Sequence, residues 1–415
     1  MPTADDPTPP PEPTRELDRR GFLRAAGLTG GGVAVGAAVG ALGYRELRHT
    51  ARPAAQSSTS PDTVSYFGPH QPGVADRAPA SMRFTTYTLD PGIGKTELSR
   101  LLKAVGVAAA SIMAGRWVAE QGPVPDGLAA AGLTVTVGLG GRAVTAAGQV
   151  PPGALAAIPP FRGDELQPAR SGGDLAVQVC GADTMVVASA ARALTRIAGN
   201  RARPAWSQSG FLPEAAKREP TDTPRNLLGQ PDGTDNPTGS RLELAVWVPA
   251  DAKPDWMIGG TYLVCRRIRM LLPEWETRTV TEKQKVIGRY LDNGAPLSGG
   301  SEHTPPDFAA LDSSGKPVVP KDAHIRLTHP VNNSGATMLR RGYSYDEGFR
   351  PDGQPEAGLF FQAFQTDPRE VFVPIMRKLS ASDALGTFIR HESSTVFAIP
   401  PGASSGGYAG ETLFS

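Results

Sequence analysis

The sequence predicts an α+β fold with antiparallel sheets, built from two similar halves. Segments with the two-residue alternation of strands and segments with helical spacing are mixed, without the strict strand–helix alternation of a parallel sheet. The pattern of the first half restarts after a long polar connection at residues 201–236. The chain has 415 residues, of which 40% are hydrophobic and 20% charged, so it can form one large domain or two ordinary ones.

The first half is expected to contain three strands and two helices. Its strands are predicted from apolar runs rich in β-branched side chains at residues 82–89, 133–139 and 175–179. One helix is indicated by side chains that recur at helical spacing, namely Leu98, Leu101, Leu102 and Val105. The other is an alanine-rich stretch at residues 183–198.

The second half repeats this mixture. Strands are predicted at residues 242–248, 261–270, 358–365 and 395–399, and a long loop at residues 294–322. Thr279 and Glu282 form a capping box that opens a short helix ending at Gly288. Asp367 and Glu370 indicate the start of another helix. The buried face of that helix is expected to consist of Val371, Phe372, Ile375, Met376 and Leu379.

Composition excludes several classes of protein. Because 42 Lys and Arg balance 41 Asp and Glu, the net charge of +1 gives no reason to expect a nucleic-acid partner. Two cysteines rule out a disulfide framework and a four-cysteine zinc site. We expect Cys180 and Cys265 to be buried thiols, although a bridge between them stays open. Gly94-Lys95-Thr96 does not complete a phosphate-binding loop, because Leu89 stands where that motif needs glycine.

The N-terminus has the pattern of an export signal. Arg19 and Arg20 precede 20 uncharged residues, 25–44, of which seven are glycine and six alanine. Such a stretch is long enough to span a bilayer, but its hydrophobicity is weak. We therefore favour a twin-arginine signal at residues 1–44 over a permanent membrane anchor. A flexible linker is expected at residues 45–80, and the twin-arginine machinery is the expected partner, with delivery to the cell envelope, a periplasm-like space or the medium.

Two further segments carry residues suited to catalysis. The first, residues 226–237, contains Asp232 in a Pro-Asp-Gly sequence that is by itself a common turn. The second, residues 323–345, contains His324 and His329, whose spacing of five does not match a helical metal-binding pair. Each segment alone favours a structural role.

Together, these segments resemble the dye-decolourising haem peroxidases, and most closely the exported A type that includes the bacterial deferrochelatase/peroxidases. The similarity extends from about residue 80 to the C-terminus and includes residues 259–264, 287–289, 294–297, 358–361 and 397–402. The resemblance implies two ferredoxin-like domains, at residues 81–225 and 226–415, with haem b bound mainly by the second. The expected oligomeric state cannot be derived from the sequence.

The resemblance implies that His324 is the proximal ligand of haem iron. A neutral imidazole ligand needs a carboxylate or carbonyl partner on its other nitrogen. Asp383 matches a family carboxylate near this histidine, and a helix N-cap is the alternative role. His329-Pro330-Val331 stands where the subgroup usually has Asn-Pro-Arg, which makes His329 a rival ligand and removes one arginine near a haem propionate.

On the distal side, Asp232 matches the family's acid–base residue and Arg340 its arginine. The carboxylate is expected to move a proton between the peroxide oxygens, and the guanidinium to stabilise negative charge on the leaving oxygen. Aspartate ordinarily titrates near pH ~4, so an acidic optimum is expected. Leu359 and Phe361 match residues that narrow the distal pocket, and strand packing is the alternative for both. Pro231 replaces a residue that is usually basic.

Further haem contacts are implied for the loop after Asp232 and for three arginines. The loop residues Gly233, Thr234 and Asp235 are expected at the haem edge. Arg289, Arg326 and Arg341 are candidates for the propionates, with ordinary solvation as the alternative.

The implied substrates are hydrogen peroxide and small aromatic reductants or dyes, oxidised in one-electron steps. A narrow distal pocket excludes bulky dyes, and their oxidation is then expected to proceed through Trp or Tyr radicals at the surface. Tyr343 and Tyr345 are the first candidates, because they lie near Arg340 in the sequence. The other tryptophan candidates are Trp117, Trp206, Trp247, Trp256 and Trp275. Two alternatives stay open: a deferrochelatase that releases iron from intact porphyrin, and a non-catalytic haem or iron carrier. A carrier needs neither Asp232 nor Arg340.

Overall fold

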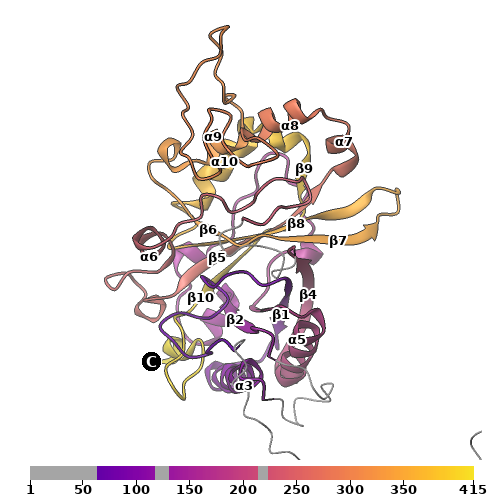
Figure 1. The fold of residues 1–415 in the computed structure, drawn as a ribbon. Helices are drawn as coiled ribbons and strands as arrows, with labels where there is room; N and C mark the ends of the chain where they lie inside the picture. The colour runs from indigo at the N-terminus through magenta and orange to yellow at the C-terminus, as the bar shows by residue number, and fades with distance from the viewer. Residues whose placement is uncertain (1–62, 117–129, 214–222) are drawn as a thin grey trace, which may run out of the picture. The chain divides into compact units, whose positions relative to one another are not determined.

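A four-stranded antiparallel sheet with two helices on one face forms the first half of the fold (Figure 1). The structure, a computed structural model, describes residues 63–116, 130–213 and 223–415. The elements follow in the order β1 (Ser81–Leu89), α3 (Lys95–Met113), β2 (Thr134–Leu139), β3 (Leu175–Gly181), α5 (Thr184–Ala198) and β4 (Ala202–Phe211). The spatial order β4-β1-β3-β2 with antiparallel pairing is the ferredoxin-like arrangement.

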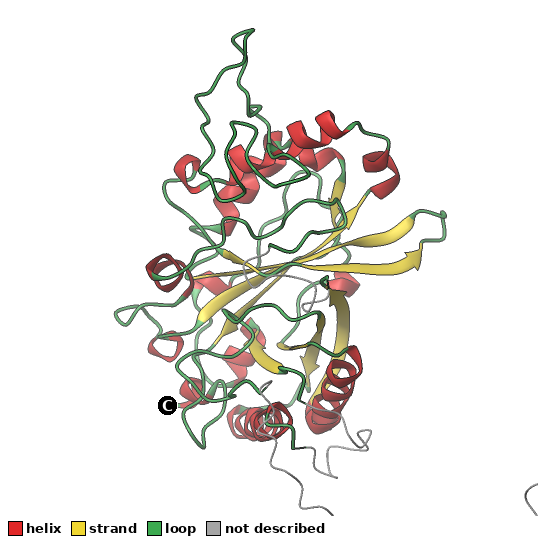
Figure 2. Cartoon of the chain, in the orientation of Figure 1, coloured by secondary structure: helices red, strands yellow, loops and turns green. Residues whose placement is uncertain are grey.

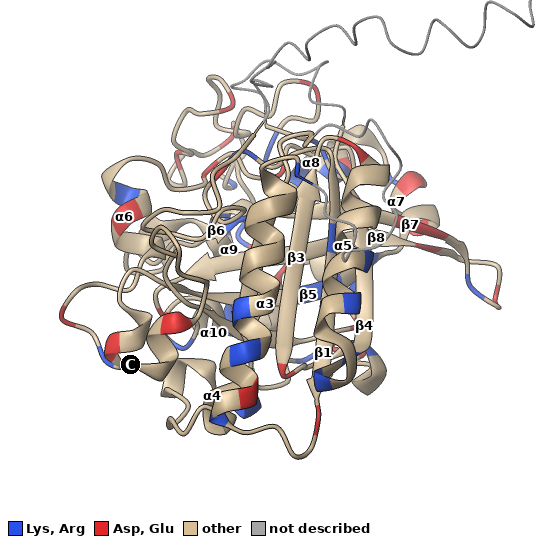
Figure 3. Ribbon diagram, turned by 90° about the horizontal axis from the view of Figure 1, so that it is seen from below, with Lys and Arg blue, Asp and Glu red and all other residues tan. Residues whose placement is uncertain are grey.

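The two helices of this half form where their sequences predict. α3 buries Leu98, Leu101, Leu102 and Val105, the side chains with helical spacing. α5 begins after Asp183, whose carboxylate accepts hydrogen bonds from the backbone N–H groups of Met185 and Val186. Figure 3 shows the helices side by side over the sheet, with positive and negative residues both distributed along the visible ribbon.

The second half repeats the arrangement. Its strands are β5 (Thr261–Met270), β6 (Leu339–Arg340), β7 (Tyr343–Phe349), β8 (Pro355–Gln365), β9 (Ile389–His391) and β10 (Thr395–Ile399). The order β10-β5-β8-β7 has the same antiparallel ferredoxin-like pattern as the first half. β6 is a short edge strand beside β8, and β9 pairs with the end of β5. The predicted α+β fold with two ferredoxin-like units is confirmed.

The two sheets meet at both edges. Phe211 of β4 pairs with Ser344 of β7, and Leu139 of β2 pairs with Ala398 of β10. One ten-stranded sheet therefore runs through both halves. The boundary between residues 225 and 226 stays a prediction.

Short helices complete the fold and lie mostly beside the long loops of the second half (Figure 2). They are α4 (Gly141–Ala146), α6 (Ser240–Val246), α7 (Leu272–Glu276), α8 (Val280–Ile287), α9 (His324–Thr328) and α10 (Phe372–Ser382). The predicted capping box is present at α8, where Thr279 accepts from the N–H of Glu282 and the Glu282 carboxylate accepts from the N–H of Thr279. Gly288 ends this helix at a φ of 96°, a conformation that favours glycine.

Two predicted elements differ from the structure. The predicted polar connection at residues 201–236 contains β4. Most side chains of this strand are exposed, so the sequence shows no apolar run there, and pairing with β1 stabilises the strand. Residues 242–248 were predicted as a strand, but most of them belong to α6, in which only Val246 is buried and Leu244 is 80% exposed. A short apolar run does not distinguish a strand from a helix.

Two boundaries also need correction. Residues 63–80 fall in the predicted flexible linker, yet Tyr66, Gln71 and Val74 are buried against the folded chain. The helix predicted from Asp367 begins later, at Phe372, because Asp367 first closes a turn by accepting from the N–H of Arg369 at 2.7 Å. Phe372, Ile375 and Met376 are buried as predicted, whereas Val371 and Leu379 are only partly buried and Val373, which was not predicted, is buried.

Cys180 and Cys265 are buried and unpaired, which confirms the thiols and removes the possible bridge. The predicted signal region at residues 1–44 and the first part of the predicted linker lie outside the described residues. Within residues 63–116, 130–213 and 223–415, no helix combines the length and the apolar character needed to cross a bilayer.

Candidate active site

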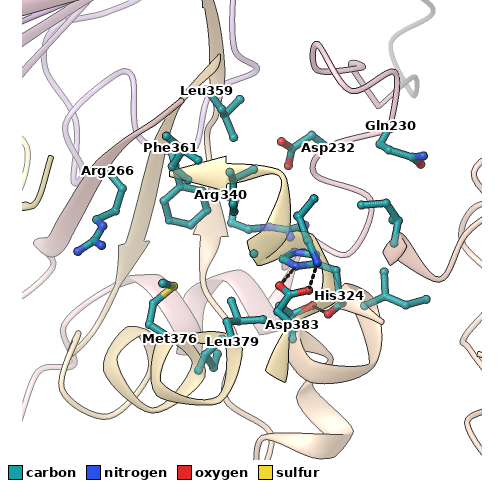
Figure 4. A pocket seen from close by; sticks show the side chains of 18 of the residues that line it. Gln230, Asp232, Arg266, His324, Arg340, Leu359, Phe361, Met376, Leu379 and Asp383 are labelled. Atoms are coloured by element: carbon teal, nitrogen blue, oxygen red, sulfur yellow. Dashed lines mark hydrogen bonds and ion pairs between the residues drawn. The ribbon is translucent and has the colours of Figure 1, made fainter. Parts of the chain in front are cut away.

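A cavity of about 490 Å³ is lined mainly by residues of the second half, together with residues 162–164 of the first half. One wall is the face of β5 and β8 that carries Ile268, Leu359 and Phe361, and the opposite wall comes from α9 and α10 (Figure 4). Because strand side chains alternate between the two faces of a sheet, residues two apart on one strand reach the same wall. Leu359 and Phe361 therefore narrow the cavity and also pack within the strand layer, so both roles expected for them are present.

His324 and Asp383 meet on the wall formed by α9 and α10. Nδ1 of His324 lies 2.7 Å from Oδ2 of Asp383, although 59 positions separate the residues. The other carboxylate oxygen of Asp383 accepts from the N–H of Leu385 at 2.9 Å and caps a short 3-10 helix. Asp383 thus fills both roles that the sequence suggested. A carboxylate at Nδ1 favours the tautomer protonated there and leaves the lone pair of Nε2 for a metal.

Asp232 and Arg340 lie on the other side of the cavity (Figure 4). Nδ2 of Asn226 donates a hydrogen bond of 3.2 Å to Oδ2 of Asp232, within the turn that carries the aspartate. The guanidinium of Arg340 lines the cavity and forms no hydrogen bond or ion pair with the described residues. This side of the cavity thus combines a proton acceptor, Asp232, with a cation that has no partner among the described residues, Arg340. Such a pair suits the cleavage of a bond that needs both proton transfer and stabilisation of negative charge.

The predicted loop residues Gly233, Thr234 and Asp235 also line the cavity, together with Arg289 and His329. Thr234 donates to the Glu302 carboxylate at 2.9 Å, and Arg289 donates to the carbonyls of Gly294 and Glu302 at 2.7 and 2.8 Å. Burial lowers the pKa of the Arg289 guanidinium, whereas Glu302 acts in the opposite direction.

His329 also lines the cavity, but its surroundings differ from those of His324. Its Nδ1 accepts a hydrogen bond of 3.2 Å from the N–H of Val331, and burial lowers the pKa of the imidazole. Within the described residues no carboxylate pairs with this ring, whereas Asp383 pairs with His324. This contrast favours His324 as the ligand.

Two predicted haem contacts need correction. Arg326 does not line the cavity, since its guanidinium donates to the carbonyls of Phe308 and Val319 at 2.9 and 2.6 Å and so holds the long loop. Arg341 is buried in the core, where it donates to the carbonyl of Asp76. Arg289 is the one of the three candidate arginines that reaches the cavity.

Sequence reasoning missed a buried polar cluster that lines the cavity. Arg266 of β5 forms an ion pair with Asp164 of the first half, and its Nε lies 3.4 Å from Nδ1 of His391. The Arg266 and Asp164 side chains are 0% and 5% exposed. These residues come from three distant segments, so no local pattern indicates that they meet. The available signal was the predicted strand at residues 261–270, which contains three arginines among apolar residues.

The described aromatic residues among the candidate electron carriers do not line the cavity. No described Trp or Tyr is part of its wall. Tyr343 and Tyr345 are buried, with 0% and 1% of their surfaces exposed, so neither is a surface residue. Trp117 lies outside the described residues.

The fold consists of two ferredoxin-like sheets, and its cavity places an imidazole–carboxylate pair opposite an aspartate and an arginine. These features together are those of a class of haem peroxidases. Family models described as "Dyp-type peroxidase, N-terminal" and "Dyp-type peroxidase, C-terminal" match residues 71–212 and 223–404. The chain belongs to the Dyp-type peroxidase family.

Individual relatives agree with this assignment. The chain is 40% identical to a dye-decolorizing peroxidase of Thermobifida fusca (strain YX), over 98% of this chain and 99% of that protein. It is 32% identical to a deferrochelatase of Yersinia pestis, over 84% of each. The structure of ferric DtpA from Streptomyces lividans superposes with a TM-score of 0.82 and 40% identity, covering 88% of this chain and 100% of that one.

Proposed function

We propose that this protein is an exported haem b peroxidase that uses hydrogen peroxide to oxidise small aromatic reductants or dyes in one-electron steps. The observation that carries the proposal is the cavity with the His324–Asp383 pair on one wall and with Asp232 and Arg340 on the other. The relative named as a dye-decolorizing peroxidase supports the choice of substrates.

The residues present fit a haem group. The cavity of about 490 Å³ falls within the range of about 300 to 1,000 Å³ typical of ligand sites. Its walls are largely apolar around the carboxylate-paired imidazole of His324, and Arg289, which also lines the cavity, would offer a cation to a propionate. Nε2 of His324 is the nitrogen left for iron, because Nδ1 is occupied by Asp383.

When bound, haem supplies a redox-active iron at which a peroxide is cleaved and single electrons are exchanged. Asp232 accepts a proton from one peroxide oxygen and returns it to the other, and Asn226 holds the carboxylate. Arg340 stabilises the negative charge that develops on the leaving oxygen. Asp383 orients the imidazole of His324.

Deferrochelatase activity is the second candidate, because relatives with that name match 84% of the chain at 32% identity. A carrier without catalysis is disfavoured by the presence of both Asp232 and Arg340 at the cavity. Incubation with haem followed by fluorescence detection of free protoporphyrin separates iron release from peroxidase turnover.

The test of the peroxidase proposal is stopped-flow spectroscopy of the haem-loaded protein mixed with hydrogen peroxide. We expect a rapid change in the Soret band in the native protein. Its rate constant should fall by about 10²- to 10⁴-fold in Asp232→Ala, the range typical of general acid–base catalysis, and by about 10²- to 10³-fold in Arg340→Ala. A native-like rate in either variant contradicts the role assigned to that residue.

Export by the twin-arginine route is proposed from Arg19, Arg20 and the uncharged residues 25–44. Its test is the cellular distribution of the full chain. Arg19→Lys combined with Arg20→Lys keeps the charge and should retain the protein inside the cell. Unchanged export of the double variant rejects the proposed route.

A further inference from the structure

One amide links the loop that carries Asp232 to the strand that carries Arg340. Nδ2 of Asn236 donates to the backbone carbonyl of Arg340 at 2.8 Å, and the backbone N–H of Arg340 donates to Oδ1 of Asn236 at 3.0 Å. The reciprocal bonds fix the orientation of the amide, because the N–H needs an oxygen acceptor and the carbonyl needs an N–H donor.

The position of β6 explains why this contact matters. β6 is two residues long and lies at the edge of the sheet, with β8 on one side. The backbone N–H of Arg341 donates to the carbonyl of Gln362 in β8. The backbone N–H and C=O of Arg340 instead point to the side of β6 that has no neighbouring strand. Asn236 satisfies both of these edge groups as a neighbouring strand would.

The backbone of Asn236 is held within its own loop. The backbone N–H of Asn236 donates to the carbonyl of Gly233 at 2.9 Å and closes the turn that follows Asp232. Gly233 has a φ of 123°, and a Cβ built there would lie 3.4 Å from Nδ2 of Asn236. Among the described residues no other hydrogen bond joins residues 226–237 to residues 338–342.

We propose that Asn236 is a positioning residue that sets the guanidinium of Arg340 relative to the carboxylate of Asp232. The inference rests on the proposed function for the roles of those two groups. It assigns Asn236 no contact with a reacting atom. A displacement of about 1 Å between catalytic groups can cost about 10²-fold in rate. The two hydrogen bonds of Asn236 therefore affect the rate through the distance between Arg340 and Asp232.

The first test uses the apoprotein and does not depend on catalysis. We expect hydrogen–deuterium exchange at the backbone amide of Arg340 to be at least about tenfold faster in Asn236→Ala, because its acceptor is lost. Asn236→Asp keeps an acceptor for that amide and should restore much of the protection. Equal exchange in the native protein and Asn236→Ala overturns the clamp itself.

The chain offers a matched control for loss of such an amide. Gln71 makes the same reciprocal pair with the backbone of Val137 in β2, at 3.0 and 2.8 Å, and does not line the cavity. Its Nε2 also donates to the carbonyl of Pro400 at 3.0 Å, so Gln71→Ala removes at least as many hydrogen bonds as Asn236→Ala, but outside the cavity wall. Cyanide affinity of the haem-loaded protein, read from the Soret shift, should fall about tenfold in Asn236→Ala and remain native-like in Gln71→Ala.

A double variant tests whether Asn236 acts through Arg340. If it does, Asn236→Ala should change cyanide affinity little in an Arg340→Leu background, since the group that it positions is gone. An undiminished effect there, or an effect in the single variant no larger than that of Gln71→Ala, refutes the positioning role. If the native protein binds cyanide but does not react with peroxide, the proposed function fails while the clamp is still tested.

Discussion

Replacing Asp383 by asparagine should weaken haem retention through His324. The carboxylate is 4% exposed and lies 2.7 Å from the imidazole Nδ1, so water cannot readily replace it. An asparagine that keeps its oxygen on the N–H of Leu385 presents an NH₂ group to Nδ1. The ring must then carry its proton on Nε2, which removes the lone pair needed by iron.

The alternative amide orientation is also unfavourable. It keeps an oxygen on His324 but turns an NH₂ group toward the N–H of Leu385, and loss of such a cap costs about 1 kcal/mol. Removing a partner of a metal-bound histidine typically lowers metal affinity about 10- to 100-fold. At about 1.4 kcal/mol per tenfold change, the expected loss of haem-binding free energy is about 1.4 to 2.8 kcal/mol.

The assay is the transfer of haem to an excess of an apoprotein scavenger, followed at the Soret band. Asp322→Asn is the matched control. It removes the same charge, but from an exposed side chain two residues before His324. We expect faster haem loss in Asp383→Asn and native behaviour in Asp322→Asn. Equal haem loss in the two variants, or native retention in Asp383→Asn, refutes the reasoning.

Three other predictions follow from buried charges and thiols. Asp164→Ala leaves Arg266 as an unpaired buried cation and should lower the free energy of unfolding, measured by urea titration, by about 3 to 5 kcal/mol. Glu165→Ala is the control, because it removes a carboxylate that is 52% exposed, and it should cost less than about 1 kcal/mol in the same titration. Burial, Arg266 and His324 lower the pKa of His391 to about 3 from 6.5, so the unfolded chain binds a proton that the folded protein does not between these values. Stability should therefore fall as the pH drops from 6.5 toward 3, and thermal melting of His391→Gln should show a shallower acid limb. Cys180 and Cys265 are fully buried and burial raises the pKa of both thiols, so a thiol reagent should modify them only after denaturant unfolds the chain; rapid labelling of the native protein contradicts this.

Sequence pattern predicted the elements that local chemistry determines. β5 and β10 have the predicted bounds, and α8 has both its capping box and its terminal glycine, because these signals lie within the segments themselves. β4 was missed because its alternation is weak and its stability comes from pairing with β1. Tertiary pairing of this kind is not visible in a single segment.

The candidate site shows the same division. His324, Asp383, Asp232 and Arg340 were found through a family resemblance, and the cavity brings all four together. Asn236 belongs to the recognised motif, but its partner is the backbone of Arg340, 104 positions away, and a backbone group leaves no mark in the sequence. Arg326 illustrates the opposite error, because an arginine close to His324 in sequence points to loop carbonyls.

The first half of the fold is a structural part of the site rather than a separate support. Asp164, from the first half, pairs with Arg266 on the cavity face of β5. On the opposite face of the same strand, Arg267 is 2% exposed. Its Nε donates a hydrogen bond of 2.9 Å to Oε1 of Gln208 in β4. Within the described residues, the carboxylate paired with Arg266 comes from the first half, whereas Arg267 pairs with Glu347, Glu356 and Glu392 of the second half. Because an unpaired buried cation is strongly destabilising, Asp164 of the first half stabilises this strand and, with it, one wall of the cavity.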